Sequence, residues 1–256
     1  MLKHFVIRNL HSLLGFENYL FIFSIFKIST LNLYKNKTEY LHFTKLFSDD
    51  ANIIIIGANT GITTVPIAKN VPDGKIFAVE PVKENYDILV KVIEHYKLKN
   101  TKALNYALGS ENKMIEMVMP IVDNTKSHGL CYIGEVNQEK YGKGIKFTVE
   151  MKKLDDLFST FKESIDGIKV VAENYEKFIF EGAEELIKKN MPLIYCELWF
   201  NENRNKVLDL IRSWNYEIFV FANNALVLYD ENKHPTRSLF FVPKSKREKD
   251  VKFNIK

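Results

Sequence analysis

The strongest hydrophobic pattern in the chain is Ile53–Ile56, an unbroken run of β-branched residues. Such a run is typical of a central parallel strand that other elements cover on both faces. It ends in a turn bounded by Gly57 and Gly61, and glycine permits both a sharp bend and a close approach of the backbone to a ligand. Asn59, inside this turn, tolerates left-handed backbone better than most residues other than glycine. The pattern therefore predicts a strand, a tight turn and a helix over residues 62–70.

Further hydrophobic patterns extend this unit into an α/β domain. A second strand over residues 75–80 ends in Glu80, and residues 83–96 form an amphipathic helix with its apolar side chains on one side. Residues 102–109 are predicted to form a third strand and its exit loop. We also predict strands at residues 114–119, 145–151, 167–171, 192–198, 216–221 and 238–242, and helices at residues 154–161, 178–188 and 201–214. Together they predict a seven-stranded, mostly parallel sheet with helices on both faces and one inserted pair of strands.

The segments that flank this domain differ from it in character. Residues 1–48 have the apolar spacing of two or three short helices, and residues 244–256 form a basic tail that we expect to be mobile. The domain itself spans residues 49–243. Within the N-terminal extension, residues 19–31 are apolar but contain Lys27, and they fall short of the ~20 residues that a membrane-spanning helix needs. We expect this helix to pack on the domain, and a peripheral contact with a membrane or a lipid-linked substrate stays open.

Composition narrows the possible functions. The 256 residues are 46% hydrophobic and 27% charged, as in a globular protein with a substantial core. The formal net charge of +4 is small and the lysines are scattered, so the sequence does not indicate a nucleic-acid partner. The two cysteines, Cys131 and Cys196, form neither a disulfide framework nor a metal-binding spacing. Together with the lack of a signal-peptide pattern, they favour a cytoplasmic location.

The turn and the acid that follows it indicate a nucleoside site. Glu80 ends the second strand about 20 residues past the turn, the distance expected of an acid that binds ribose hydroxyls. A dinucleotide fingerprint would need glycine at positions 57, 59 and 62, but the chain has Asn59 and Ile62. The phosphate-binding loop motif is absent as well. A ligand with a ribose but no pyrophosphate fits best, which favours S-adenosylmethionine over a nicotinamide cofactor. A glycine turn that serves only the fold is the simpler alternative.

At this point the chain resembles the FkbM-type S-adenosylmethionine-dependent methyltransferases. The resemblance covers about residues 50–243 and is carried by residues 56–61, 77–81, 105–109, 168–176, 181–183 and 194–197. It implies a class I methyltransferase fold and O-methylation, often of sugars or polyketides. It also implies that the cofactor is bound by Gly57, Ala58, Asn59, Thr60, Gly61, Glu80, Pro81, Asn105, Tyr106 and Ala107. The acceptor implied is a small molecule or a glycan.

Three positions depart from the pattern of this family. The family usually has an acid where Ile55 stands, an aspartate where Val171 stands and a glycine where Asn174 stands. An acid at position 55 would contact the methionine amino group. Metal-dependent relatives hold a divalent ion at the position of Val171, so we expect no metal here. The departures also keep open a second hypothesis, a degenerate methyltransferase fold that binds its ligand without turnover.

A methyl acceptor with a hydroxyl group needs a base within hydrogen-bond reach. Glu173, which follows the fourth strand of the parallel set, is the first candidate, although it could equally cap the next helix. Glu197 ends the fifth strand and could instead be a buried carboxylate that bonds loop amides. His128 lies in the polar segment 120–144, which is long enough to be a functional or a disordered loop. A solvated histidine is the alternative there.

Overall fold

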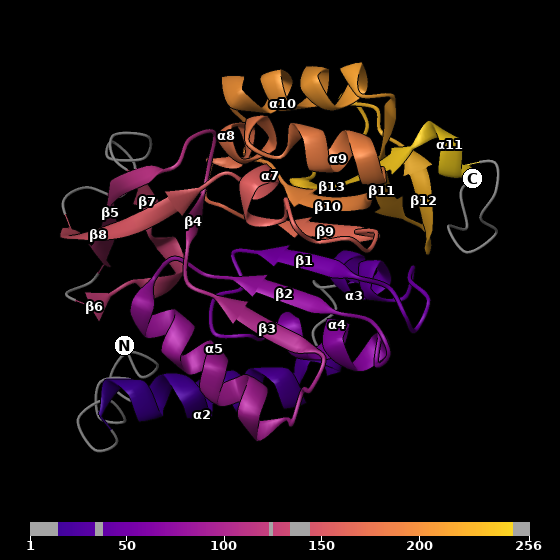
Figure 1. Ribbon diagram of the computed structural model, residues 1–256. Coiled ribbons are helices and arrows are strands. Elements are labelled where there is room, and N and C mark those ends of the chain that lie inside the picture. Colours follow the sequence, from indigo (N-terminus) through magenta and orange to yellow (C-terminus); the bar gives the residue numbers. More distant parts are fainter. Residues whose placement is uncertain (1–14, 34–37, 123–124, 134–143, 248–256) are drawn as a thin grey trace.

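The computed structural model describes residues 15–33, 38–122, 125–133 and 144–247 (Figure 1). Its centre is an eight-stranded sheet. In chain order the strands are β1 (Ile53–Ile56), β2 (Ile76–Val79), β3 (Thr101–Leu104), β9 (Gly167–Val170), β10 (Leu193–Glu197), β11 (Tyr216–Ala222), β12 (Ala225–Leu228) and β13 (Ser238–Pro243). Across the sheet they run β12-β11-β13-β10-β9-β1-β2-β3. Strands β3, β2, β1, β9 and β10 are parallel, and β13 is antiparallel to both of its neighbours.

The predicted mostly parallel sheet is confirmed, and one edge strand extends it. Strand β12 pairs with β11 through a hairpin whose two turn residues are Asn223 and Asn224. Both residues have positive φ, 54° and 59°, as the tight hairpin turn requires. The sequence prediction stopped at residue 221 and missed this strand. Residues 102–109 were predicted as a strand and its exit loop, and the strand is β3. The exit loop contains a short further strand, β4 (Ala107–Leu108), which pairs with β8 of another sheet.

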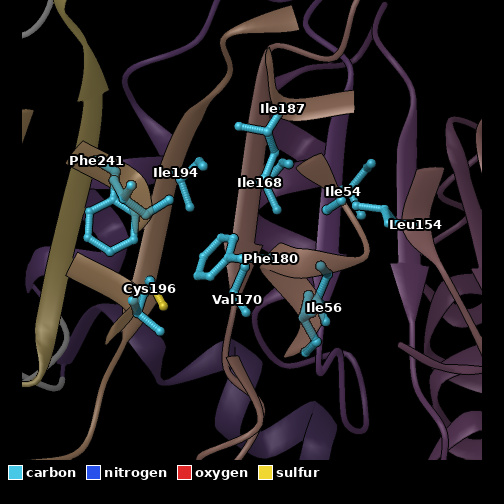
Figure 2. Packing of buried hydrophobic residues seen from close by; sticks show 14 of the residues in the cluster. Ile54, Ile56, Leu154, Ile168, Val170, Phe180, Ile187, Ile194, Cys196 and Phe241 are labelled. Carbon is cyan, nitrogen blue, oxygen red and sulfur yellow. The ribbon is translucent and has the colours of Figure 1, made fainter. Parts of the chain in front are cut away.

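Helices cover both faces of the sheet (Figure 1). One face carries α2 (Phe16–Ser29), α3 (Thr38–Thr44), α4 (Thr64–Asn70) and α5 (Lys83–His95), and the other carries α7 (Leu154–Leu157), α8 (Glu176–Glu181), α9 (Glu184–Asn190) and α10 (Glu202–Ser213). Successive side chains of β1 belong to two different hydrophobic clusters. Ile53 and Ile55 face one helical layer, and Ile54 and Ile56 face the other. Figure 2 shows the second cluster, in which Ile54 and Ile56 lie near Ile168 of β9. An all-apolar strand is therefore required at this position.

A second, smaller sheet lies at the carboxyl ends of β1, β2 and β3 (Figure 1). Its strands are β4, β5 (Lys113–Val122), β6 (Thr125–Lys126), β7 (Tyr132–Ile133) and β8 (Gly144–Lys152). The antiparallel pair β5 and β8 is the predicted inserted pair. The segment expected to be a loop instead contributes β6, β7 and a short 3-10 turn, η3 (His128–Leu130), while its residues 134–143 lie outside the described part of the chain. This sheet closes over the edge where the parallel strands end.

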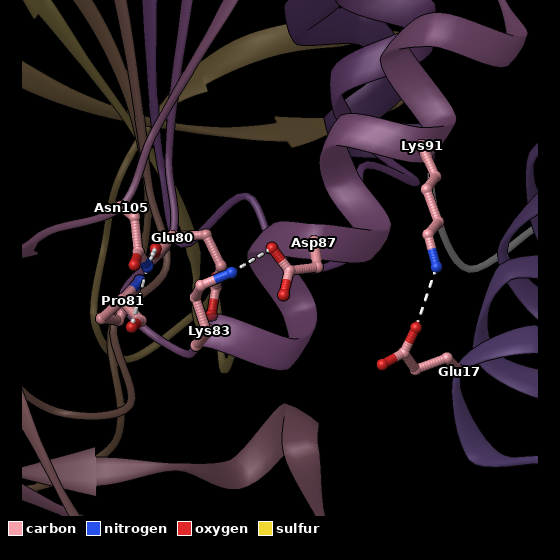
Figure 3. A network of polar contacts seen from close by, with 7 residues as sticks. All are labelled: Glu17, Glu80, Pro81, Lys83, Asp87, Lys91 and Asn105. Carbon is pink, nitrogen blue, oxygen red and sulfur yellow. Dashed lines mark hydrogen bonds and ion pairs between the residues drawn. The ribbon is translucent and has the colours of Figure 1, made fainter.

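The N-terminal extension packs on the domain through α2 and α3. Lys91 of α5 forms an ion pair with Glu17 of α2 at 2.9 Å (Figure 3), and the Tyr40 hydroxyl of α3 donates a hydrogen bond to the carbonyl of Thr63. The side chain of Phe26 on α2 is exposed. The peripheral membrane contact stays a prediction. Among the described residues, no helix is long and apolar enough to cross a membrane.

The C-terminal end continues as a short helix, α11 (Lys244–Arg247), where a mobile tail was expected. The rest of the predicted tail, like residues 1–14 of the predicted extension, lies outside the described residues. The domain limits at residues 48 and 243 stay predictions.

Candidate active site

The turn after β1 has the backbone that its two glycines predict. Gly57 and Gly61 have φ of +73° and +88°, and Asn59 between them has φ of 50°. A Cβ on Gly57 would lie 2.0 Å from the carbonyl oxygen of Val171 at the end of β9. Only glycine can therefore occupy position 57, because the turn and β9 approach each other closely and the backbone is left-handed.

Every amide of this turn is already hydrogen bonded within the protein. The N–H groups of Gly57 and Ala58 donate to the carbonyl of Val79 at 3.1 and 3.0 Å, and that of Gly61 donates to Ala58 at 3.0 Å. The Thr60 N–H donates to the Asn59 side-chain oxygen at 2.7 Å, and the Asn59 N–H donates to Glu80 Oε2 at 2.8 Å. A pyrophosphate site needs free amides that point at the ligand. This turn offers none, which disfavours a nicotinamide dinucleotide as the ligand.

Glu80 is a buried carboxylate held in one orientation. Glu80 is only 4% exposed. Its Oε1 accepts hydrogen bonds from the Val82 N–H at 3.1 Å and from Asn85 Nδ2 at 3.2 Å. Burial raises the pKa of Glu80 to about 7, although the hydrogen bonds and the charge of Lys169 act to lower it. A carboxylate can accept about four hydrogen bonds. Oε2, with one donor from the turn, has room to accept a ribose hydroxyl.

A cavity opens beside Glu80 at the carboxyl ends of the strands. Seven of the predicted site residues line it: Gly57, Asn59, Glu80, Pro81, Tyr106, Ala107 and Glu173. Asn105 supports the wall from behind, since its Nδ2 donates to the carbonyls of Glu80 at 2.8 Å and Pro81 at 3.1 Å (Figure 3). This position, where parallel strands end, is the usual place for a ligand in an open α/β sheet.

The other predicted cofactor residues occupy different places. Ala58 lines a second cavity, which adjoins the first. The Thr60 hydroxyl is buried and lies 2.7 Å from the hydroxyl of Ser24 on α2. Gly61 packs against α5, where a Cβ would lie 3.0 Å from Leu89. Direct cofactor contacts from Thr60 and Gly61 stay predictions.

The second sheet supplies a wall that the sequence analysis missed. Met117 of β5, Cys131, and Tyr132 and Ile133 of β7 line the first cavity, as does Gly129 of η3. Burial raises the pKa of the Cys131 thiol, so this thiol stays protonated and is a poor nucleophile. Strand β7 was not predicted because it has only two residues and the segment around it is polar. Among the described residues, no group of three His, Cys, Asp or Glu side chains could hold a metal ion.

Glu173 lies at a strained turn that a second glutamate supports. Glu173 and Asn174 have φ of 47° and 74°, and the Asn174 side-chain oxygen accepts a hydrogen bond from Asn201 Nδ2 at 2.8 Å. Asparagine tolerates this backbone, which explains how it can replace the glycine of the family. Glu176 is 2% exposed and accepts a hydrogen bond from the Ala172 N–H at 2.9 Å. Burial raises the pKa of Glu176 to about 7. The hydrogen bond of Glu176 thus stabilises the turn that places Glu173 at the cavity.

The three predicted catalytic residues do not come together at one point. Glu173 lines the first cavity, whereas Glu197 lines the second. Glu197 Oε1 accepts a hydrogen bond from the Tyr195 hydroxyl at 3.1 Å, and this hydroxyl lies 3.1 Å from Ser238 Oγ. His128 begins η3, next to the cavity residue Gly129, but its side chain lies outside what the structure describes. A catalytic role for each of the three stays a prediction.

This strand order, with helices on both faces and a glycine turn against a buried acid, defines a Rossmann-like class I methyltransferase. The sequence matches the family described as methyltransferase FkbM domain over residues 56–218, and the chain belongs to that family. This membership confirms the expected resemblance, the methyltransferase class and S-adenosylmethionine as the cofactor.

Two relatives illustrate the match. Methyltransferase sdnD of Sordaria araneosa is 24% identical over 203 residues, which cover 69% of this chain and 78% of the relative. The crystal structure of methyltransferase FkbM from Methylobacillus flagellatus KT superposes with a TM-score of 0.51 at 15% identity. That superposition covers 76% of this chain but only 44% of the bacterial one. At this identity it shows a shared fold.

The residues present fit the adenosyl part of this cofactor. Glu80 offers a buried acceptor for ribose hydroxyls, and the apolar residues Val82, Leu108 and Ile133 offer a surface for the base. The turn lies beside them without free amides for a phosphate. A nucleoside that carries no phosphate suits this combination.

Proposed function

We propose that this protein methylates a hydroxyl group of a sugar, a glycan or another hydroxylated metabolite, without a metal ion. The observation that carries this proposal is the buried Glu80 carboxylate, bonded at 2.8 Å to a turn that has no amide left for a phosphate. We further propose that the protein works in the cytoplasm and has no nucleic-acid partner. The small net charge of +4 supports the latter.

Bound S-adenosylmethionine supplies a methyl group that the positive sulfur already activates for in-line displacement by oxygen. The protein therefore has two tasks, alignment of the acceptor and removal of water. The second sheet supports the removal of water, because Met117, Tyr132 and Ile133 place apolar side chains along one wall of the first cavity.

Glu173 is the proposed general base. It follows β9 and lines the first cavity, where its carboxylate would accept the proton as the acceptor oxygen forms its bond to carbon. Its left-handed backbone, φ 47°, is a strained conformation of the kind that clusters at functional sites. Glu176 keeps this backbone in place through its hydrogen bond to the Ala172 N–H.

The test is transfer of labelled methyl from S-adenosylmethionine to panels of sugars, oligosaccharides and small hydroxylated metabolites. We expect transfer to at least one hydroxylated acceptor, resistance of that transfer to a metal chelator, and a loss of about 10²-fold or more in turnover with Glu173→Gln. Glu184→Gln is the matched control, because Glu184 is an acid on α9 whose side chain is 47% exposed. Tight binding of NAD, or cofactor binding with no transfer to any hydroxylated acceptor, would contradict the proposal.

A further inference from the structure

Helix α2 carries apolar side chains on both of its sides. It lies beside α5 (Figure 1), and its inner side packs on the hydrophobic cluster that contains Ile53 through Leu20, Phe21, Ile25 and Ile28. The opposite side, here called the outer face of α2, consists of Tyr19, Ile22, Phe23 and Phe26, which lie three or four residues apart. Ile22 is 51% exposed and Phe26 is 57% exposed.

We propose that the outer face of α2 docks on a lipid surface that carries anionic headgroups. The helix then lies in the plane of the interface, with Ile22, Phe23 and Phe26 inserted between the lipids. This interaction surface is separate from the methyl-transfer site and does not depend on the identity of the acceptor.

The composition of α2 favours a lipid surface. A helix that is apolar on all sides is normally buried on all sides, whereas the outer face of α2 is open to solvent. Three of the four residues of the outer face are aromatic, and aromatic side chains are typical of helices that lie at the boundary between headgroups and acyl chains. With 14 residues, α2 is shorter than the ~20 residues of a membrane-spanning helix, so it lies on the surface.

The charge of the N-terminal extension indicates which headgroups the surface carries. Residues 1–38 contain one acid, Glu17, and its charge is offset by the ion pair with Lys91. The same stretch contains five basic residues, of which Lys27 is the one in the described part of the chain: Lys3, Arg8, Lys27, Lys35 and Lys37. An apolar segment with an excess of positive charge is complementary to an anionic lipid surface such as the cytoplasmic leaflet of a membrane.

Lys27 places one of these charges beside the outer face. Its Nζ lies 5.5 Å from the centre of the Phe23 ring. A lysine in this position can lay its aliphatic stem along an apolar surface and keep its ammonium group among the headgroups. A second copy of the chain fits the face less well, because two basic extensions brought together repel each other.

Docking of α2 would bring the cofactor site close to the lipid. Ser24, on the inner side of the helix, lies 2.7 Å from the hydroxyl of Thr60 in the glycine turn. The turn is therefore separated from the outer face by roughly one helix diameter, about 10 Å.

The proposal is tested by sedimentation of the intact chain with vesicles of phosphatidylcholine alone or with about one third phosphatidylglycerol. We expect at least about tenfold tighter binding to the anionic vesicles, and most of this difference should be lost when NaCl is raised from about 0.05 M to about 0.5 M. Phe26→Ser should weaken binding to the anionic vesicles by about tenfold or more. Phe200→Ser is the matched control, because Phe200 is 61% exposed and contacts Arg204 of α10 on the opposite face of the sheet. It should stay within about twofold of the parent.

Ile22→Ser is a second variant of the outer face and should weaken binding in the same way. Both substitutions change exposed side chains, so both variants should unfold at the temperature of the parent. Absence of binding to the anionic vesicles, equal binding to both kinds of vesicle, or parent-like binding by both variants would overturn the proposal. A dimer of the parent that Phe26→Ser dissociates, measured by light scattering, would also overturn it, because the outer face would then be an interface between copies.

Discussion

Ser24 Oγ of α2 lies 2.7 Å from Thr60 Oγ1 in a hydrogen bond that is buried from solvent. Ser24 is the only buried residue of its helix, which is otherwise rich in partly exposed apolar side chains. One polar contact thus joins the N-terminal extension directly to the glycine turn. The extension is therefore part of the support for the site, rather than an appendage to the domain.

Loss of that contact should destabilise the protein. In Ser24→Ala the Thr60 hydroxyl loses a buried partner, and we expect the free energy of unfolding to fall by about 1–3 kcal/mol. Chemical denaturation measures this change. Ser29→Ala is the control, since the Ser29 hydroxyl makes only an exposed hydrogen bond to Phe26, and it should change stability by less than about 0.5 kcal/mol. Equal stability of the two variants would show that the buried contact contributes nothing.

A side chain at position 57 should be poorly tolerated. The Cβ of Gly57→Ala would lie 2.0 Å from the Val171 carbonyl oxygen on backbone with φ of +73°, so either the turn or the end of β9 must move. We expect a stability loss of about 1–3 kcal/mol or more and a large loss of cofactor affinity. Gly129→Ala provides the comparison in the same cavity, because its nearest neighbour would be Asn59 Nδ2 at 3.7 Å, an ordinary contact. Thermal unfolding and calorimetry report the two effects separately.

Neutralising Glu80 should weaken the binding of the cofactor more than it changes the stability of the fold. Glu80→Gln keeps the shape but weakens the acceptor, and we expect the affinity for S-adenosylhomocysteine to fall by about tenfold or more. Glu84→Gln, an exposed acid in the first turn of α5, should leave affinity unchanged. Unchanged affinity in Glu80→Gln would remove the ribose role of this acid.

The buried acids Glu80 and Glu176 should make stability depend on pH. Burial raises both pKa values to about 7, above the value near 4.3 of a glutamate in an unfolded chain. Between these values the folded state holds protons that the unfolded chain has released. The free energy of unfolding should therefore fall as the pH rises from about 4.5 to about 7, by up to about 1.4 kcal/mol per pH unit for each group. Above the folded pKa these groups add no further pH dependence.

Glu176→Gln isolates one of these two contributions. Glutamine resembles the protonated acid and cannot release a proton, so the variant should lose stability less steeply over the same pH range. Denaturation at pH 5, 6 and 7 measures the slope. Glu184→Gln, a change at an acid whose side chain is 47% exposed, should keep the slope of the parent. A steeper slope in Glu176→Gln would contradict the assignment.

The part of the site that local sequence could predict is the strand, turn and acid around Gly57 and Glu80. There each residue type is required by the local structure, either a strand covered on both faces or a left-handed turn. Such local requirements produce a recognisable sequence pattern. Strand order was predictable to the extent that the βαβ connections fix it. Strand β12 was missed because its hairpin uses two asparagines, a weaker signal than Asn-Gly.

The second cavity could not be predicted in this way. Glu39, Lys169, Glu197 and Ser238 are separated by long stretches of sequence, and they meet at one wall only through the order of the strands and the position of α3. Glu197 was noticed as a polar residue that ends an apolar strand. The wall from β7 was hidden for another reason, because its two residues, Tyr132 and Ile133, lie within a polar segment.

The closed hydrogen bonding of the turn at residues 57–61 has a consequence for catalytic cycling. Because these amides take their acceptors from Val79, Glu80 and the turn itself, we expect the backbone of the turn to keep its shape when a ligand binds. Little conformational entropy is then lost on loading, and little refolding is needed when the spent cofactor departs. We therefore expect the turn to stay unchanged while one nucleoside is exchanged for the next.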